Sequence, residues 1–176
     1  QPSLDNLSSR FGIKTGSDNN AIIDGADVVV LAVKPQQLKA VCADVKERLL
    51  AQKPLIISIA AGIRCDAIEM WLDKSLPIVR CMPNTPALIG QAASGLYANV
   101  NVSGEQKALA ETLLSAVGTV DWVNAENLLD AVTAVSGSGP AYFFLVMEAM
   151  IDAGIQLGLT PEASRNLTLQ TALGAA

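Results

Sequence analysis

Histidine is absent from this 176-residue sequence. Its absence excludes His-based catalytic triads, HExxH zinc sites and histidine general bases, and so argues against most hydrolase chemistry. Cysteine is scarce: Cys42, Cys65 and Cys81 are far apart, with no CxxC and no metal-like spacing. This pattern indicates reduced thiols, no metal site and a cytoplasmic setting.

Aromatic residues make up only 4% of the chain, although 51% of it is hydrophobic. Ala, Val, Leu and Ile must therefore form the core, which is typical of strands buried on both faces beneath helices. The net charge of −5 and the lack of a basic stripe exclude nucleic acid as an expected partner.

Long apolar runs are also absent. Val28–Val33, Leu55–Ile63 and Ala141–Met147 are the longest, and all are far below the roughly 20 residues that span a bilayer. The N-terminus shows no cationic and apolar signal pattern. No membrane partner is expected.

Strand patterns alternate with helix patterns in the first two thirds of the chain. The β-branched run Asp27–Val33 has no polar alternation and predicts a central parallel strand. From residue 124 onward only helical patterns remain. We predict an α/β fold, with a doubly wound parallel sheet in residues 1–124 and the start of an all-helical domain in residues 125–176. The other predicted strands are Leu55–Ile59, Pro77–Cys81, Ala92–Ala98 and Thr119–Val123.

The segment Ser136–Pro140 (SGSGP) separates two predicted helices, Glu126–Val135 and Ala141–Leu157. Pro140 suits the first turn of a helix, and the glycines allow a close approach of the backbone. The free N–H groups of a new helix would attract a carboxylate or phosphate. A simple capped turn between helices explains the segment equally well.

Ligands of open α/β sheets bind at the carboxyl ends of the strands. Lys34 at the first strand end can meet a phosphate or can simply be solvated. The small residues Ala60–Gly62 leave room for a ligand or permit close helix packing. Asn84 and Thr85 lie between two prolines, which favours a ligand contact over a merely stiff loop. Asn19 suits either a ribose contact or a helix cap.

Four motifs occur together in order: Val30–Gln36, Ser58–Gly62, Arg80–Pro86 and Asp130–Tyr142. This set resembles the pyrroline-5-carboxylate reductase family across essentially the whole chain. The resemblance implies an NAD(P)-binding Rossmann domain, a helical domain that forms a homo-oligomer, and an imino acid substrate. The implied reaction is hydride transfer from NADPH, or NADH, to the C=N carbon, which gives L-proline.

The resemblance also implies site residues. An iminium substrate already carries its proton, so positioning and electrostatics dominate, in keeping with the missing histidine. The implied cofactor contacts are Asn19, Ala32, Val33, Lys34, Pro35, Ile59, Ala60, Ala61 and Asn84. The implied substrate contacts are Ser136, Gly137, Ser138 and Gly139, with Ser136 and Ser138 as catalytic candidates.

The chain departs from that family because no GxGxxG turn precedes its first strand and no further helices follow its last. We therefore expect a fragment that is inactive alone. A β-hydroxyacid dehydrogenase-like enzyme is a second interpretation, although Ala141–Leu157 has no lysine where that family places a catalytic one. A non-catalytic nucleotide-binding module is a third.

Overall fold

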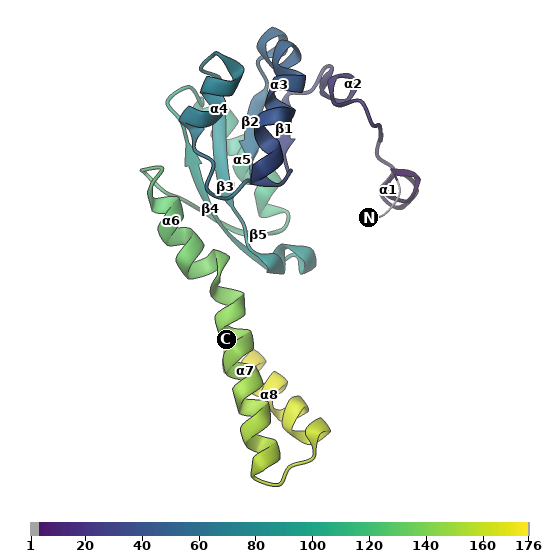
Figure 1. The fold of residues 1–176 in the computed structure, drawn as a ribbon, viewed down its shortest axis with the longest axis vertical. Helices are drawn as coiled ribbons and strands as arrows, with labels where there is room; N and C mark the ends of the chain where they lie inside the picture. The colour runs from purple at the N-terminus through teal and green to yellow at the C-terminus, as the bar shows by residue number, and fades with distance from the viewer. Residues whose placement is uncertain (1–3, 176) are drawn as a thin grey trace.

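A five-stranded sheet with a projecting helical arm makes up the computed structural model, which describes residues 4–175 (Figure 1). Residues 1–3 and 176 of the predicted domains lie outside the described residues. The strands follow the order β1 (Val28–Leu31), β2 (Leu55–Ser58), β3 (Ile78–Met82), β4 (Ala92–Ala98) and β5 (Gly118–Trp122). This mostly parallel sheet with flanking helices, followed by a helical region, confirms the predicted Rossmann-like class.

Two details of the sheet differ from the prediction. β3 and β4 are antiparallel, and β1 lies at an edge, pairing only with β2 among the described residues. The prediction that β1 is a central strand is wrong. β-branched residues indicate that a strand is packed beneath helices, and they do not indicate that it has a neighbouring strand on each side. Val29 and Leu31 are buried, whereas Val30 is 51% exposed.

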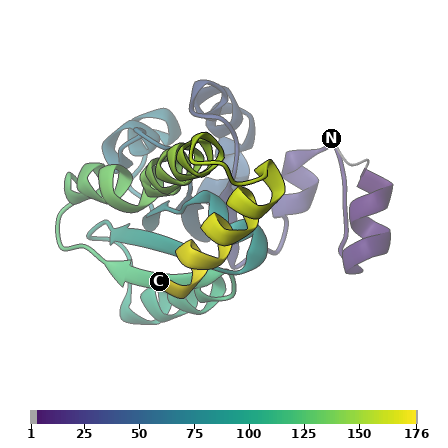
Figure 2. The ribbon, with the colours of Figure 1, turned by 90° about the horizontal axis from the view of Figure 1, so that it is seen from below.

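Helices cover both faces of the sheet, as Figure 2 shows. On one face lie α3 (Pro35–Gln52) and α4 (Cys65–Leu72), and on the other lies α5 (Gly104–Ser115). α3 buries Leu38, Cys42, Val45 and Leu49, whose spacing of three and four places them on one helix face. Two short helices precede the sheet, α1 (Leu4–Phe11) and α2 (Asn19–Ile23). Asp18 caps α2, because its carboxylate accepts the Asn20 and Ala21 N–H groups.

The arm begins beside the sheet, and the turn between its last two helices lies far from the sheet (Figure 1). It contains α6 (Leu128–Val132), the π-turn η2 (Thr133–Gly137) and α7 (Gly139–Gln156), and α8 (Pro161–Ala175) folds back along α7. The Ser164 hydroxyl donates to the Ile151 carbonyl at 2.7 Å and ties these two helices together.

The predicted break at Ser136–Pro140 is instead a π-turn inside a continuous helix. The Ser138 N–H donates to the Thr133 carbonyl at 2.8 Å, and the Ala141 N–H donates to the Ser138 carbonyl at 3.0 Å. The helix therefore does not start afresh there, and the expected row of open amides is wrong.

The continuous helix has a second consequence. Leu128–Gln156, with 29 residues, is long and apolar enough to cross a membrane by length and composition alone. The short apolar runs did not predict this, because the π-turn joins two segments that the sequence separates. The expectation of no membrane partner stays a prediction.

Candidate functional site

The carboxyl ends of β1, β2 and β3 meet at one edge of the sheet, because these strands are parallel. Ala32 and Lys34 follow β1 and are exposed. Pro35 opens the 18-residue helix α3, and no side chain caps that helix. The start of α3 therefore presents a cation and helix N–H groups at the sheet edge.

A small cavity of about 140 Å³ lies beside β1. Asn19, Ala32 and Val33 line it, so the structure brings together three predicted cofactor contacts from separate segments. Asn19 is not the cap of α2, since Asp18 takes that role. The Asn19 amide donates to the Asp44 carboxylate at 3.4 Å.

After β2, the backbone turns through the small residues predicted to face a ligand. Ile59 is partly buried, Ala60 is buried and Ala61 is exposed. Gly62 has a φ of +74°, a conformation that favours glycine. This strand end thus offers little side-chain bulk above the sheet edge.

Asn84 joins the end of β3 to the arm. Its amide oxygen accepts the Ala93 N–H at 3.0 Å, and its amide nitrogen donates to the Ser136 carbonyl at 3.1 Å. In a regular helix that carbonyl would accept the N–H of residue 140, but Pro140 has none. Asn84 therefore satisfies the acceptor that Pro140 leaves open.

The glycines of the π-turn differ in what surrounds them. A Cβ on Gly137 would lie 2.8 Å from the Met82 Cε, so the turn closely approaches β3. A Cβ on Gly139 would meet nothing within 4 Å, although Gly139 is buried. The end of the flexible Met82 side chain would have to shift for a larger residue at position 137, and packing does not explain glycine at position 139.

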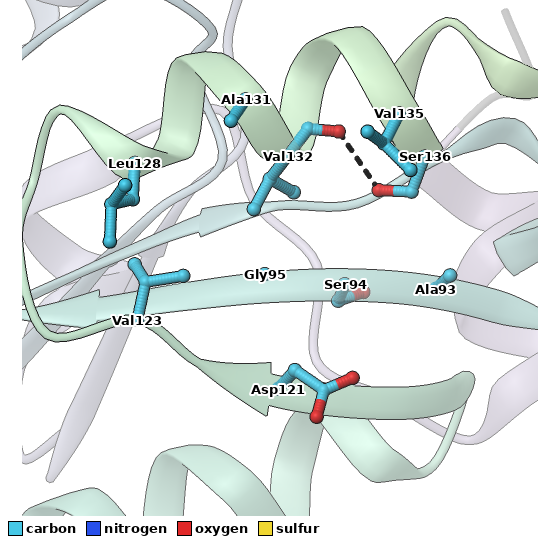
Figure 3. A pocket seen from close by; sticks show the side chains of 10 residues that line it. All are labelled: Ala93, Ser94, Gly95, Asp121, Val123, Leu128, Ala131, Val132, Val135 and Ser136. Carbon is cyan, nitrogen blue, oxygen red and sulfur yellow. Dashed lines mark hydrogen bonds between the residues drawn. The ribbon is translucent and has the colours of Figure 1, made fainter.

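A cavity of about 410 Å³ lies between strands β4 and β5 and the base of the arm (Figure 3). Its walls are mainly apolar and include Val132 and Val135, with Asp121 on the opposite side. A Cβ on Gly95 would lie 2.6 Å from the Val132 methyl groups, so glycine permits α6 to approach β4. The Ser136 hydroxyl donates to the Val132 carbonyl at 3.0 Å.

Sequence reasoning missed an ion cluster at the base of the arm, in which the Arg80 and Glu126 side chains are largely buried and Arg64 is exposed. The Glu126 carboxylate pairs with the Arg80 guanidinium at 3.0 Å and with Arg64 at 3.2 Å, and it accepts the Cys65 N–H at 2.6 Å. A charged residue, Arg80, inside the predicted strand Pro77–Cys81 was the available signal, since a buried arginine requires a partner. Burial, together with the Glu126 charge, raises the pKa of Cys65 to about 12.

The predicted residues thus gather at two places. Asn84 and Ser136 are in direct contact, and Asn19, Ala32 and Val33 share a cavity. Ser138 lies at the bend between η2 and α7. Within residues 4–175, no group of three or more His, Cys, Asp or Glu residues could hold a metal ion.

Two family models match the chain. "Pyrroline-5-carboxylate reductase dimerisation" matches residues 126–176, and "NADP oxidoreductase coenzyme F420-dependent" matches residues 1–62. The first match includes the whole arm, and the second includes β1, α3 and β2.

Individual relatives agree with these matches. A pyrroline-5-carboxylate reductase of Pseudomonas aeruginosa is 57% identical over 97% of this chain and 62% of its own length. The structure of such a reductase from Coxiella burnetii has a TM-score of 0.93 and 50% identity, covering 98% of this chain and 65% of that one.

A Plasmodium falciparum pyrroline carboxylate reductase, solved with NADP bound, has a TM-score of 0.83 and 36% identity, covering 90% of this chain and 60% of that one. The chain spans 62% of the length of the first three curated relatives that it matches.

Proposed function

This chain belongs to the pyrroline-5-carboxylate reductase family, and we propose that its protein reduces 1-pyrroline-5-carboxylate to L-proline with NADPH or NADH. The single observation that carries the proposal is the 57% identity to such a reductase along 97% of the chain. The contact between Asn84 and Ser136 supports it, because it joins the predicted cofactor side to the predicted substrate side.

The strand ends fit a dinucleotide. Ala32, Ala60 and Ala61 leave space above the sheet edge, while Lys34 and the uncapped start of α3 suit phosphate charge. When bound, NAD(P)H supplies the hydride for a C=N carbon. The chain's own contribution is then to hold the reactants in register and to exclude water.

We place the imino acid beside Ser136–Gly139. Because the helix is continuous there, hydroxyl groups rather than a row of open amides are the donors available to a substrate carboxylate. The Ser136 hydroxyl already donates to Val132, so Ser138 at the bend is the better candidate for that contact. The unused space around Gly139 suits a ligand atom.

The arm suits a homo-oligomer. Phe143, Leu145 and Val146 are 72%, 67% and 58% exposed, and a groove of about 550 Å³ lies between α7 and α8. An apolar surface of this kind usually marks an interface. The match to the dimerisation model supports a second copy as the partner.

We also propose a division of the chain into residues 1–124 and 125–176, and a soluble cytoplasmic enzyme. β5 ends at Trp122 and α6 begins at Leu128, which is where such a boundary belongs. The three cysteines are buried and free, as a reducing compartment permits.

A hybrid protein tests the activity. Residues 1–176 replace the matching segment of the Pseudomonas aeruginosa relative, which supplies the rest of the length. With pyrroline-5-carboxylate, we expect the hybrid to consume NADPH or NADH and to form L-proline. With a 3-hydroxyacid and the oxidised cofactor, we expect no reaction. Activity on the hydroxyacid alone would instead support the dehydrogenase interpretation. A hybrid with no activity on either substrate would support the non-catalytic binding module. The 176-residue chain alone should be inactive.

A pair of glycine variants tests the substrate position in that hybrid. Gly139→Ala adds a methyl group where the structure has space, and Gly104→Ala does the same at the start of α5. Both should leave thermal stability nearly unchanged. Only Gly139→Ala should raise KM for the imino acid, and equal kinetics of the two variants would contradict the placement.

A further inference from the structure

The Glu126 carboxylate is held on three sides. Arg80 and Arg64 pair with its two oxygens at 3.0 and 3.2 Å, and the Cys65 N–H donates to it at 2.6 Å. The Arg80 and Glu126 side chains are only 8% and 10% exposed. Ions so shielded from water interact strongly, and their geometry is fixed by their partners.

The partners of Glu126 belong to the strand ends. Arg64 and Cys65 follow the turn after β2, three and four residues after the predicted cofactor contact Ala61. Arg80 lies in β3, four residues before Asn84. Glu126 therefore contacts residues close to the two strand ends that we assign to the cofactor, in the middle of β3 and at the start of α4.

Glu126 also starts the arm. Its carbonyl accepts the Leu129 N–H at 3.1 Å, and the helical stretch Leu128–Gln156 follows, with a bend at Ser138. Ser138 lies twelve residues further on, or about 18 Å along a helix. A tilt of about 5° at Glu126 would move Ser138 by about 1.5 Å, given that helical rise.

Other contacts also hold the same helix: Leu129 is buried, Val132 packs against Gly95, and the Ser136 carbonyl accepts from Asn84. They fix the distance of the arm from the sheet near its π-turn. Among the described residues, only the Glu126 cluster holds the first turn of the arm by ion pairs to residues on the cofactor side.

We propose that Glu126 is a positioning residue, which sets the angle of the helical arm so that the substrate segment Ser136–Gly139 faces the cofactor-binding strand ends. This inference rests on the proposed function. A purely structural Glu126 would change the amount of folded protein but not the turnover of each folded molecule.

Kinetics of the hybrid enzyme test the inference. Rates are normalised to NADPH-binding sites and measured well below the unfolding temperature. Glu126→Gln should lower kcat about tenfold to a hundredfold, as a displacement near 1 Å does, with KM for NADPH unchanged. Glu126→Asp, which keeps the charge, should restore part of kcat. Glu111→Gln is the matched control, because Glu111 accepts a hydrogen bond from Trp122 outside the site. An unchanged kcat in Glu126→Gln overturns the inference.

A distance measurement on the 176-residue chain needs no activity. Spin labels at Ala51→Cys in α3 and Asp152→Cys in α7 report the angle of the arm, since both positions are exposed and the native thiols are buried. Dilution with unlabelled chain suppresses signals between copies. Glu126→Gln should broaden or shift the distance distribution, whereas Glu111→Gln should not. An unchanged distribution overturns the inference, while a wild-type hybrid that reduces no imine refutes only the proposed function.

Discussion

At the scale of single residues, the Asn84 amide has an unusual task. It satisfies one backbone donor in β4 and one backbone acceptor in the π-turn, on opposite sides of the site. Both groups are partly buried, so their loss would not be fully compensated by water. A direct cofactor contact, which the sequence predicts for Asn84, would have to use the remaining lone pair or N–H of the same amide.

Replacing Asn84 should therefore reduce stability. Asn84→Ala leaves both backbone groups without their partner, and we expect a loss of about 1–3 kcal/mol in the free energy of unfolding. Asn124→Ala, at an exposed position, should change it by less than about 0.5 kcal/mol. Urea unfolding of the chain measures both. Equal stabilities would mean that water replaces the amide and that Asn84 serves only a ligand.

The buried thiol of Cys42 makes a separate prediction about pH. Burial alone raises its pKa from 9.0 to about 11. Above pH 9 the unfolded thiol loses its proton while the folded one keeps it, so stability is full below pH 9 and falls as pH rises towards 11.

The Cys42→Ala variant isolates this effect. Between about pH 8 and pH 10, the wild-type chain should lose about 1.4 kcal/mol more stability than the variant, because one thiol accounts for that difference. The cavity left by the variant costs the same at both pH values and cancels. Urea unfolding at the two pH values provides the numbers, and parallel losses would show that the folded thiol ionises freely.

At the scale of elements, the π-turn depends on a proline and an asparagine that are far apart in the chain. Pro140 removes the N–H that would pair with the Ser136 carbonyl, and Asn84 replaces it. In a Pro140→Ala background the restored N–H can take that carbonyl. We therefore expect Asn84→Ala to cost less there, with a coupling of about 0.5–3 kcal/mol between the two positions.

Unfolding of the wild type, both single variants and the double variant completes the cycle. The Pro140→Ala variant alone also indicates whether the π-turn persists without proline, through amide exchange at Ser138. Strictly additive costs would show that Asn84 and Pro140 act independently and that the shared carbonyl is not what couples them.

Elements with local signals were predictable from the sequence, and those set by distant contacts were not. Asp18 and Ser103 cap α2 and α5, and such caps are local signals because a side chain near a helix start acts on its own neighbours. The edge position of β1 and the direction of β4 depend on pairing partners, which a single run of residues does not encode. The π-turn was predicted as a break because its compensating donor, Asn84, is 52 residues away.

At the scale of the whole molecule, the same limit applies to the site. Motif order was enough to identify the family, and the identities to reductases along the chain confirm it. The Glu126 cluster was not predicted, since Arg80 inside a strand signals only that some partner exists, and Arg64 and Glu126 join it only after folding. Roles of individual residues towards cofactor and substrate stay predictions.

The arm leads to the last prediction, that the chain associates through α7 and α8. Phe143 is 72% exposed and lines the groove between these helices, together with Val146 and Met150. Aromatic residues near the centre of an interface often contribute 2 kcal/mol or more, so Phe143→Asp should weaken association roughly thirtyfold or more. Phe11→Asp is the matched control: Phe11 is 57% exposed but lies in α1, away from the arm. Sedimentation equilibrium of the two variants and the wild-type chain gives the dissociation constants. Equal weakening by both variants would place the interface elsewhere, and a monomeric wild-type chain would show that residues 1–176 do not associate on their own.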